Sequence, residues 1–181
     1  MNSFESIIAG LFRADGYWTA IGYRVDLTKK QKRETGKPSL ARPEIDILAY
    51  KGKGNELVWV ECKSYLDSPG VRYANFKDGS DSGYHRYKVF NDARYRNAIS
   101  RSLINQTSAS GLTKPNPKLK YCLVAGKVRS ETDKKKINNL FENRDWVFHD
   151  VDWIRERLKR LTTSRYEDDI TMMVAKIIKP S

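Results

Sequence analysis

The sequence predicts an α/β fold in which a mixed β-sheet is flanked by helices. Near both ends of the chain, apolar residues recur at the three- and four-residue spacing that is typical of amphipathic helices. Shorter runs rich in Val, Ile and aromatic residues are typical of strands. The predicted order of elements, α-β-β-β-α-β-α-β-α-α, favours a mixed sheet covered by helices.

The first part of the chain is predicted to contain a helix, a strand and a loop. The helix lies in "SFESIIAGLFRADG", with Ser3 as its N-cap and Gly16 as the signal that ends it. A strand follows at 17–25. We expect a loop at 28–42, because this stretch is rich in charge and poor in apolar residues. Within it, "KKQKR" at 29–33 is either a mobile basic arm or an ordinary solvated run.

Two further strands are predicted at 44–50 and 57–63, joined by the Gly-rich turn "KGKGNE". No repeat and no long linker divides the sequence, so we expect one domain over 1–181. After an irregular stretch at 66–88, the predicted elements are a helix at 90–107, a strand at 119–126, a helix at 132–143, a strand at 146–150 and helices at 151–161 and 166–178.

The composition indicates a basic protein of the cell interior. Lys and Arg number 34 against 22 Asp and Glu, a net charge of +12, which favours a polyanionic partner such as nucleic acid. Basic ribosomal, membrane-surface or merely soluble proteins share this property. No run approaches the roughly 20 apolar residues of a membrane span. Cys62 and Cys122 lack metal-ligand spacing and are expected to be small core residues in a reducing compartment, so we expect a soluble, cytoplasmic protein.

Charged residues interrupt the two predicted strands of "RPEIDILAYKGKGNELVWVECKSY". Side chains alternate across a strand, and an antiparallel hairpin that pairs apolar with apolar residues fixes one register. A slip of one residue would move Asp46 and Glu61 to opposite faces. The register gives the pairs Ile45–Cys62, Ile47–Val60, Ala49–Val58, Asp46–Glu61 and Glu44–Lys63, so two carboxylates lie side by side with a lysine two residues on.

Adjacent carboxylates repel each other unless a bound cation offsets their charge. Mg²⁺ prefers oxygen ligands and is commonly held by one or two carboxylates, waters and a substrate phosphate. Lys63 can then orient or polarise an attacking water, or stabilise charge on the phosphate. The alternative is a surface hairpin in which Glu44 pairs with Lys63 while Asp46 and Glu61 are solvated.

Glu5 lies on the margin of the apolar face of the first helix, where an acid needs a partner or a metal. The alternative is an acid favoured near a helix N-terminus by the helix dipole. The two histidines, His85 and His149, are isolated and lack partners for a triad or a zinc site.

The sequence resembles the PD-(D/E)XK, or restriction-endonuclease-like, nuclease superfamily. The motifs are an N-terminal helix with Glu5, then "EIDILAY" and "VWVECKS", most similar to the Mrr-like and archaeal Holliday-junction-resolvase-like branches. The resemblance covers about residues 4–65. It implies a core with a four- or five-stranded mixed sheet, helices on both sides, and phosphodiester hydrolysis that depends on Mg²⁺, with Mn²⁺ able to substitute.

The resemblance also implies roles for individual residues. Asp46 and Glu61 are metal ligands, Lys63 is the catalytic lysine, and Glu5 matches the helix acid that some branches use as a further ligand. In the family a proline commonly precedes the catalytic acid directly, whereas here Pro43 precedes Glu44. Glu44 is therefore a rival ligand, although the register and the apolar residues that follow favour Asp46.

Two stretches are candidates for binding nucleic acid. "GVRYANFKDGSDSGYHRYK" interleaves aromatic and basic residues, and "NDARYRNAISRSLINQ" carries basic residues at helical spacing. The alternatives are a solvated loop with its aromatic residues tucked inward and an ordinary solvated helix face. The candidate residues are Arg72, Lys77, Arg86, Lys88, Arg94 and Arg101.

The sequence thus predicts a Mg²⁺-dependent DNA endonuclease. The alternatives are a catalytically inactive DNA-binding or assembly module on the same fold, and an RNA-cleaving relative. Cutting both strands of a duplex usually requires two active sites, so we expect a homodimer or higher even oligomer. The contact is predicted in the 66–88 loop or on the C-terminal helix; alternatively, that helix's apolar stripe covers the protomer's own sheet. The stripe contains Ile170, Met173, Val174, Ile177 and Ile178.

Overall fold

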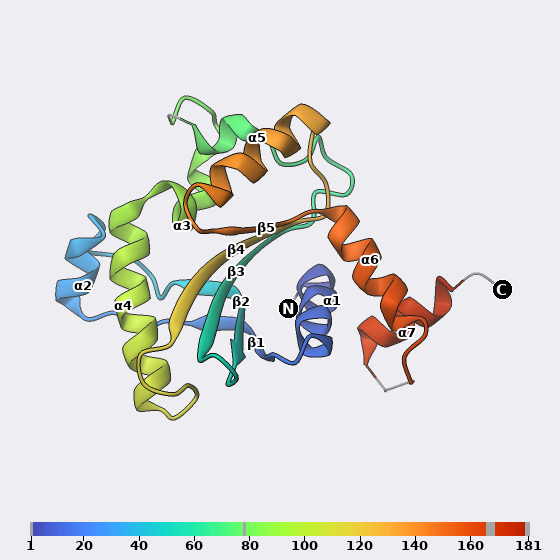
Figure 1. The fold of residues 1–181 in the computed structure, drawn as a ribbon. Coiled ribbons are helices and arrows are strands. Elements are labelled where there is room, and N and C mark those ends of the chain that lie inside the picture. The colour runs from blue at the N-terminus through green and yellow to red at the C-terminus, as the bar shows by residue number, and fades with distance from the viewer. Residues whose placement is uncertain (1, 78, 166–168, 180–181) are drawn as a thin grey trace.

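The computed structural model describes residues 2–77, 79–165 and 169–179. One mixed sheet has the strand order β1-β2-β3-β4-β5, with β1, β2 and β3 antiparallel and β3, β4 and β5 parallel. The predicted α/β fold with a mixed, helix-flanked sheet is confirmed (Figure 1). The strands are β1 (Trp18–Arg24), β2 (Glu44–Lys51), β3 (Glu56–Lys63), β4 (Lys118–Ala125) and β5 (Val147–His149).

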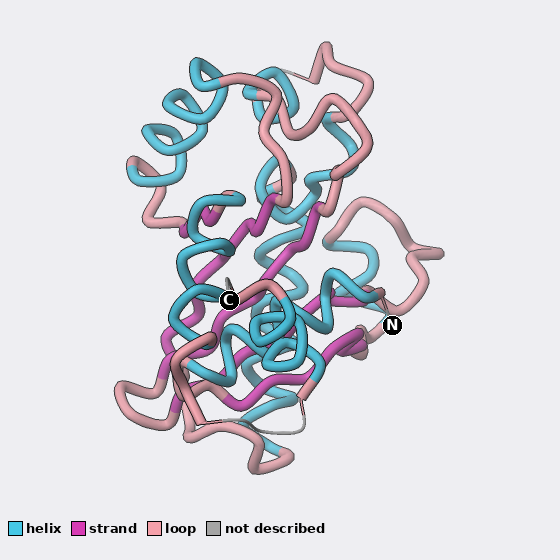
Figure 2. The backbone as a smooth tube through the Cα atoms, turned by 90° about the vertical axis from the view of Figure 1, so that its right-hand side faces the viewer, coloured by secondary structure: helices cyan, strands magenta, loops and turns pink. Residues whose placement is uncertain are grey.

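Helices cover both faces of this sheet. On one face, α1 (Ser3–Ala14) packs against β1 and β2, and α6 (Val151–Leu161) and α7 (Ile170–Ile177) pack beside it. Figure 2 views this face, with the helices in front of the strands. The other face is covered by α3 (Lys88–Asn91), α4 (Ala93–Ala109) and α5 (Glu131–Glu142), together with the short 3-10 helices η1 (Tyr73–Phe76) and η2 (Tyr84–Tyr87).

Each face of the sheet covers its own apolar core. Successive side chains of the central strands point alternately into one core and the other. Leu48 and Trp59 belong to the core under α4 and α5, whereas Ile47 and Val60 belong to the core under α1. The predicted alternation is therefore confirmed through the middle of both strands. It fails at Ile45, which joins Leu48 rather than Ile47 in the core under α4 and α5.

Several predicted boundaries differ from the structure because local capping decides them. The N-cap of α1 is Asn2, whose side chain accepts from the Phe4 N–H at 3.0 Å; the prediction of Ser3 was wrong. The predicted loop at 28–42 contains the helix α2 (Lys29–Glu34), because Thr28 and Gln31 form a reciprocal capping box and the helix packs against α4. The predicted mobile basic arm is therefore a short helix.

Other boundaries differ less. The helix predicted at 90–107 begins at Ala93, where Asp92 caps it, and α3 precedes it as a separate turn. The stretch predicted to be irregular contains η1 and η2. Of the helix predicted at 166–178, residues 166–168 lie outside the described residues, and α7 begins at Ile170, with Asp169 as its N-cap.

The C-terminal helix packs on α1 through small and polar residues. Its buried side chains are Thr171, Met172 and Ala175, and a Cβ at Gly10 would lie only 1.8 Å from Thr171 Oγ1. The stripe that includes Met173 and Ile177 is exposed instead, so the interpretation that it covers the protomer's own sheet was wrong. None of the helices in the described ranges combines the length and the apolarity that a bilayer span requires.

Candidate active site

The candidate site lies where β2 parts from β3. Within the described residues, their ladder ends at the pair Ile47–Val60, which confirms the predicted register up to that point. The predicted pairs Asp46–Glu61, Ile45–Cys62 and Glu44–Lys63 lie beyond this end of the ladder and do not form. The carboxylate of Asp46 instead accepts the backbone N–H of Cys62 through Oδ2 at 2.7 Å, which places this acid against the residue that follows Glu61.

A glycine in the neighbouring strand accompanies this break. In β1, Ile21 pairs with Ile47 and Tyr23 pairs with Ile45, so Gly22 lies across from Asp46. Gly22 has a φ of +65°, a left-handed conformation that side-chain-bearing residues rarely adopt. The register of β1 and β2 is the same on both sides of Gly22, so no residue is inserted there. Both strands instead change face at this point: Ile21 and Ile47 contact the core under α1, whereas Tyr23 and Ile45 contact the core under α4 and α5.

Glu61 and Lys63 form an ion pair at the end of β3. Lys63 Nζ donates to Glu61 Oε1 at 2.5 Å, and the two side chains are 17% and 18% exposed. Lys63 Nζ also lies 5.7 Å from the centre of the Tyr87 ring. The alternative of a Glu44–Lys63 pair with solvated acids was wrong: Glu44 is exposed and pairs with Arg24 at 3.0 Å across β1 and β2.

The environment shifts the pKa of each charged group in the site. Burial raises the pKa of Asp46 and of Glu61. The positive charge of Lys63 acts to lower both pKa values, whereas repulsion by Asp46 raises the pKa of Glu61 further. Burial acts to lower the pKa of Lys63, but Glu61 and then Asp46 outweigh it, so this pKa lies above its usual value. Lys63 is therefore a cation at neutral pH.

Glu5 lies near this group without joining it. Burial, followed by the negative charge of Asp46, raises the pKa of Glu5, so α1 brings this acid within electrostatic range. Among the residues that the structure describes, however, no three Asp, Glu, His or Cys side chains are grouped closely enough to hold a metal ion. The structure thus brings Asp46, Glu61 and Lys63 together, with Glu5 at a greater separation.

Of the two histidines, His149 is partly buried beside α6. Its ring stacks on that of Trp153 at 4.0 Å between centroids. Burial, and then the positive charge of Arg157, lower the pKa of His149 to about 4, so the ring is neutral at neutral pH. The ring packs against Phe12 of α1 and Trp153 of α6.

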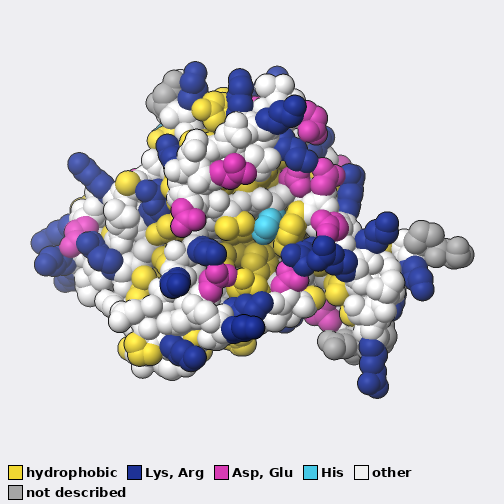
Figure 3. All heavy atoms as spheres, viewed as in Figure 1, with side chains coloured by type: hydrophobic (Ala, Val, Ile, Leu, Met, Phe, Trp, Pro, Cys, Tyr) yellow, Lys and Arg dark blue, Asp and Glu magenta, His cyan; other side chains and the backbone are white. Residues whose placement is uncertain are grey.

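The six predicted nucleic-acid-binding residues fall into separate groups. Arg72 pairs with Asp81 at 2.9 Å, and Arg101 pairs with Glu34 of α2. Lys88 and Arg94 line a hollow of about 370 Å³ that also includes Lys37. Lys77 and Arg86 are exposed. Figure 3 shows Lys and Arg spread over one face of the molecule with acidic side chains among them, rather than in one basic stripe.

The aromatic residues of the predicted binding loop divide into buried and half-buried ones. Phe76 and Tyr87 are buried in the core under α4 and α5, whereas Tyr73 and Tyr84 are half-buried. The alternative of aromatic residues tucked inward is therefore correct for Phe76 and Tyr87, and neither ring is free to stack on a base.

No protein-family model matches the chain, and neither the curated proteins nor the solved structures contain a significant match to it. Function is therefore inferred from the side chains themselves.

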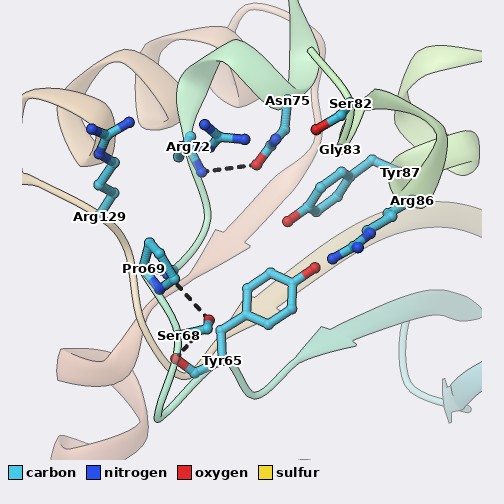
Figure 4. A pocket seen from close by; sticks show the side chains of 11 residues that line it. Tyr65, Ser68, Pro69, Arg72, Asn75, Ser82, Gly83, Arg86, Tyr87 and Arg129 are labelled. Carbon is cyan, nitrogen blue, oxygen red and sulfur yellow. Dashed lines mark hydrogen bonds between the residues drawn. The ribbon is translucent and has the colours of Figure 1, made fainter.

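One functional candidate was missed from the sequence. Arg129 lines the same cavity as Arg72 and Arg86, although it lies far along the chain from both (Figure 4). A parallel bridge between Val71 and Val128 brings the two segments together. No local pattern marks such a long-range contact, so only the structure reveals it.

Proposed function

We propose that the protein is a Mg²⁺-dependent DNA endonuclease with a restriction-endonuclease-like core. The observation that supports this proposal is the partly buried group of Asp46, Glu61 and Lys63 at the point where β2 and β3 part. Two acids with raised pKa values beside a cationic lysine are costly to bury, and such groups are concentrated at functional sites.

The donor atoms present suit a hard cation. Asp46 and Glu61 each use one carboxylate oxygen in the hydrogen bonds described above, which leaves the other oxygen of each acid for a ligand. Mg²⁺ is commonly held by one or two carboxylates, with waters and substrate phosphate completing the shell. We propose Asp46 and Glu61 as its ligands, with Glu5 as a further ligand or a nearby negative charge, and Mn²⁺ as a substitute.

The bound cation would polarise the scissile phosphate and lower the pKa of a bound water. Lys63 would contribute its positive charge. Because its pKa is raised, the ammonium group donates hydrogen bonds at neutral pH, and it can orient the attacking water or stabilise charge on the phosphate. The Cys62 N–H would hold the Asp46 carboxylate in place. The phosphodiester bond is broken by water, whose oxygen joins phosphorus while the leaving sugar oxygen gains a proton.

A second candidate is a catalytically inactive DNA-binding or assembly module on the same fold. Two observations support this candidate. Glu61 already forms an ion pair with Lys63, and the described residues contain no group of three Asp, Glu, His or Cys side chains that could hold a metal ion. An RNA-cleaving relative would use the same residues. Incubation of labelled DNA and RNA with the protein in Mg²⁺ or EDTA separates the three functions, since only the endonuclease cleaves DNA in Mg²⁺ alone.

The proposal extends to partners and assembly. The net charge of +12 suits a DNA backbone. Ile170, Met173, Ile177 and Ile178 of α7 are exposed large apolar side chains, and we propose that this stripe forms the contact of a homodimer or higher even oligomer. A cytoplasmic location remains a prediction.

A further inference from the structure

A cavity of about 430 Å³ opens beside the candidate active site, within the usual size range of small-ligand pockets. Figure 4 shows its walls, with Tyr65, Tyr87 and Arg86 on one side and Arg129 on the other. Arg72 and Asn75 lie along a third wall. Three arginines from three different segments of the chain therefore line one cavity.

The charge of this cavity is largely uncompensated. Among the described residues, Arg72 has a carboxylate partner, Asp81, which also accepts from Asn75 Nδ2 at 2.8 Å and from the Gly83 N–H at 2.7 Å. This network fixes the position of Arg72. Neither Arg86 nor Arg129 forms an ion pair within the described ranges, and the partner of Arg86 is the neutral side chain of Tyr65, so neither positive charge is offset by a carboxylate.

A glycine holds Arg129 at the cavity. Gly70 has a φ of +90°, and a Cβ there would lie 2.9 Å from the carbonyl oxygen of Lys127. Only glycine permits this close approach of the two backbones. Val71 then donates its N–H to the Lys127 carbonyl at 3.0 Å and accepts from the Arg129 N–H at 2.9 Å, which anchors Arg129 at the rim.

A buried hydroxyl without a full hydrogen bond also points to a ligand. Tyr87 is only 1% exposed and lines the cavity. The Tyr65 side chain interacts with its hydroxyl, but no group of the described residues meets that hydroxyl in full hydrogen-bond geometry. In Figure 4 this hydroxyl points toward Tyr65 and the end of Arg86. Burial raises the pKa of Tyr87 well above its usual range, so the hydroxyl keeps its proton and can donate. An orphaned buried hydroxyl is costly and requires an explanation.

The cavity adjoins the proposed catalytic group. The ring of Tyr87 belongs to both, since it lines the cavity and its centre lies 5.7 Å from Lys63 Nζ. Tyr65 follows Lys63 by two residues and lines the cavity. A strand whose scissile phosphate lay at Lys63 would therefore have a neighbouring nucleotide within reach of the arginines.

We propose that this cavity binds one phosphorylated nucleotide of the substrate strand, beside the bond that is cleaved. Guanidinium groups match phosphate oxygens with paired hydrogen bonds, and the Tyr87 hydroxyl supplies a further donor. The ring of Tyr65 offers a surface for the sugar or base. The position beside the cleaved bond rests on the proposed endonuclease function. Binding of a phosphate in the cavity does not depend on cleavage and can be measured separately.

The test measures nucleotide binding without catalysis. Thymidine 5′-monophosphate and thymidine are titrated into full-length Asp46→Asn protein in EDTA, so that neither a metal nor cleavage contributes. We expect the monophosphate to bind and thymidine not to bind. Adding Arg86→Gln and Arg129→Gln should weaken binding about a hundredfold or more, since two charged contacts with the phosphate are lost and each is worth about tenfold.

A matched control is Lys53→Gln with Lys118→Gln in the same background. It removes two exposed positive charges near the opposite end of β3. This control should change monophosphate binding less than about twofold, because charges in water beyond a Debye length are screened. Equal weakening by the two pairs of substitutions would overturn the proposal, since it would reveal a response to net charge alone.

Tyr87→Phe tests the hydroxyl separately from the fold. The substitution keeps the buried ring and removes the orphaned hydroxyl, so the melting temperature should stay the same or rise while monophosphate binding weakens. A fall in melting temperature with unchanged binding would assign the hydroxyl to stability and count against the proposal.

Short single strands distinguish the source of the phosphate. Tighter binding of a 5′- or 3′-phosphorylated strand than of its hydroxyl counterpart would assign a terminal phosphate, and equal binding that still needs Arg86 and Arg129 would assign an internal one.

A protein that binds the monophosphate through these arginines but never cleaves DNA would refute the endonuclease alone. Cleavage with an unchanged KM in the arginine double variant would refute the cavity alone.

Discussion

Asp46 combines two roles that different substitutions can separate. Its carboxylate is proposed to hold a metal, and it also accepts the N–H of Cys62, a residue only 8% exposed. Asp46→Asn removes the charge but keeps an acceptor oxygen, whereas Asp46→Ala removes both. Both variants should lose cleavage, but only Asp46→Ala should lose a buried hydrogen bond.

The structure gives the size of this difference. A buried donor left unpaired costs about 1–3 kcal/mol. For a chain of 150–250 residues, each kcal/mol shifts the melting temperature by about 2–4 °C, so Asp46→Ala should melt about 2–12 °C below Asp46→Asn. Without divalent cations at neutral pH, Asp46→Asn should melt at or above the wild-type temperature, because it no longer buries a charge.

The sign of the pH dependence follows from the raised pKa of Asp46. Burial is its largest cause, so the folded protein binds the proton more tightly than the unfolded chain does. Wild-type stability without metal should therefore rise as the pH falls from neutral through the raised pKa. The contribution of Asp46 is absent in Asp46→Asn, whose stability should change less over the same range.

Scanning calorimetry in EDTA from pH 5 to 8 measures both effects on the wild type and the two variants. Circular dichroism verifies that each variant folds, and a cleavage assay reports the loss of function. Equal melting temperatures for Asp46→Ala and Asp46→Asn would refute the assigned hydrogen bond. Wild-type turnover in Asp46→Asn would remove Asp46 from the catalytic site.

Three further predictions concern the metal, the rival acids and assembly. Mg²⁺ at about 100 times its Kd should stabilise the wild type by about 2.7 kcal/mol, and Asp46→Asn should abolish this shift; an equal shift in both would contradict the metal site. Glu44→Gln should cleave DNA much faster than Asp46→Asn, and Glu5→Gln should raise the Mg²⁺ requirement; equal loss in Glu44→Gln would identify it as the ligand. Met173→Lys with Ile177→Lys should convert a dimer to a monomer in light scattering while circular dichroism shows an unchanged fold, because the side chain of Ile177 is 74% exposed in the protomer; a wild-type monomer at every concentration would contradict the assembly.

The apolar pattern was sufficient to predict the centre of the hairpin. Ile47 and Val60 alternate with Leu48 and Trp59 without interruption, and a one-residue slip would have exposed both cores. The same pattern failed at Ile45, because β1 and β2 change face together at Gly22, whose left-handed backbone leaves the apolar composition of both strands unchanged. The proximity of Asp46 to the end of β3 was thus predictable, but the direct Asp46–Glu61 pairing does not form and the contact of Asp46 with the backbone of Cys62 was not predicted.

Two other differences have separate physical causes. The helix α2 carries few apolar residues, so periodicity did not reveal it, although Thr28 and Gln31 have the spacing of a capping box. This signal was present in the sequence and was outweighed by the charge of the segment. Arg129 gave no signal at all, because its place across the cavity from Arg86 depends on a bridge between segments that are distant in the chain.

The most direct test of the proposed function is cleavage of end-labelled duplex DNA by the wild type, Asp46→Asn, Glu61→Gln and Lys63→Met, each in Mg²⁺ and in EDTA, with a matched RNA as a second substrate. We expect the wild type to cut DNA in Mg²⁺ alone, and the three variants to bind DNA without cutting it. Cleavage that persists in EDTA or in any of the three variants would contradict the proposed site, and DNA binding with no cleavage by the wild type in Mg²⁺ or Mn²⁺ would favour the inactive binding module.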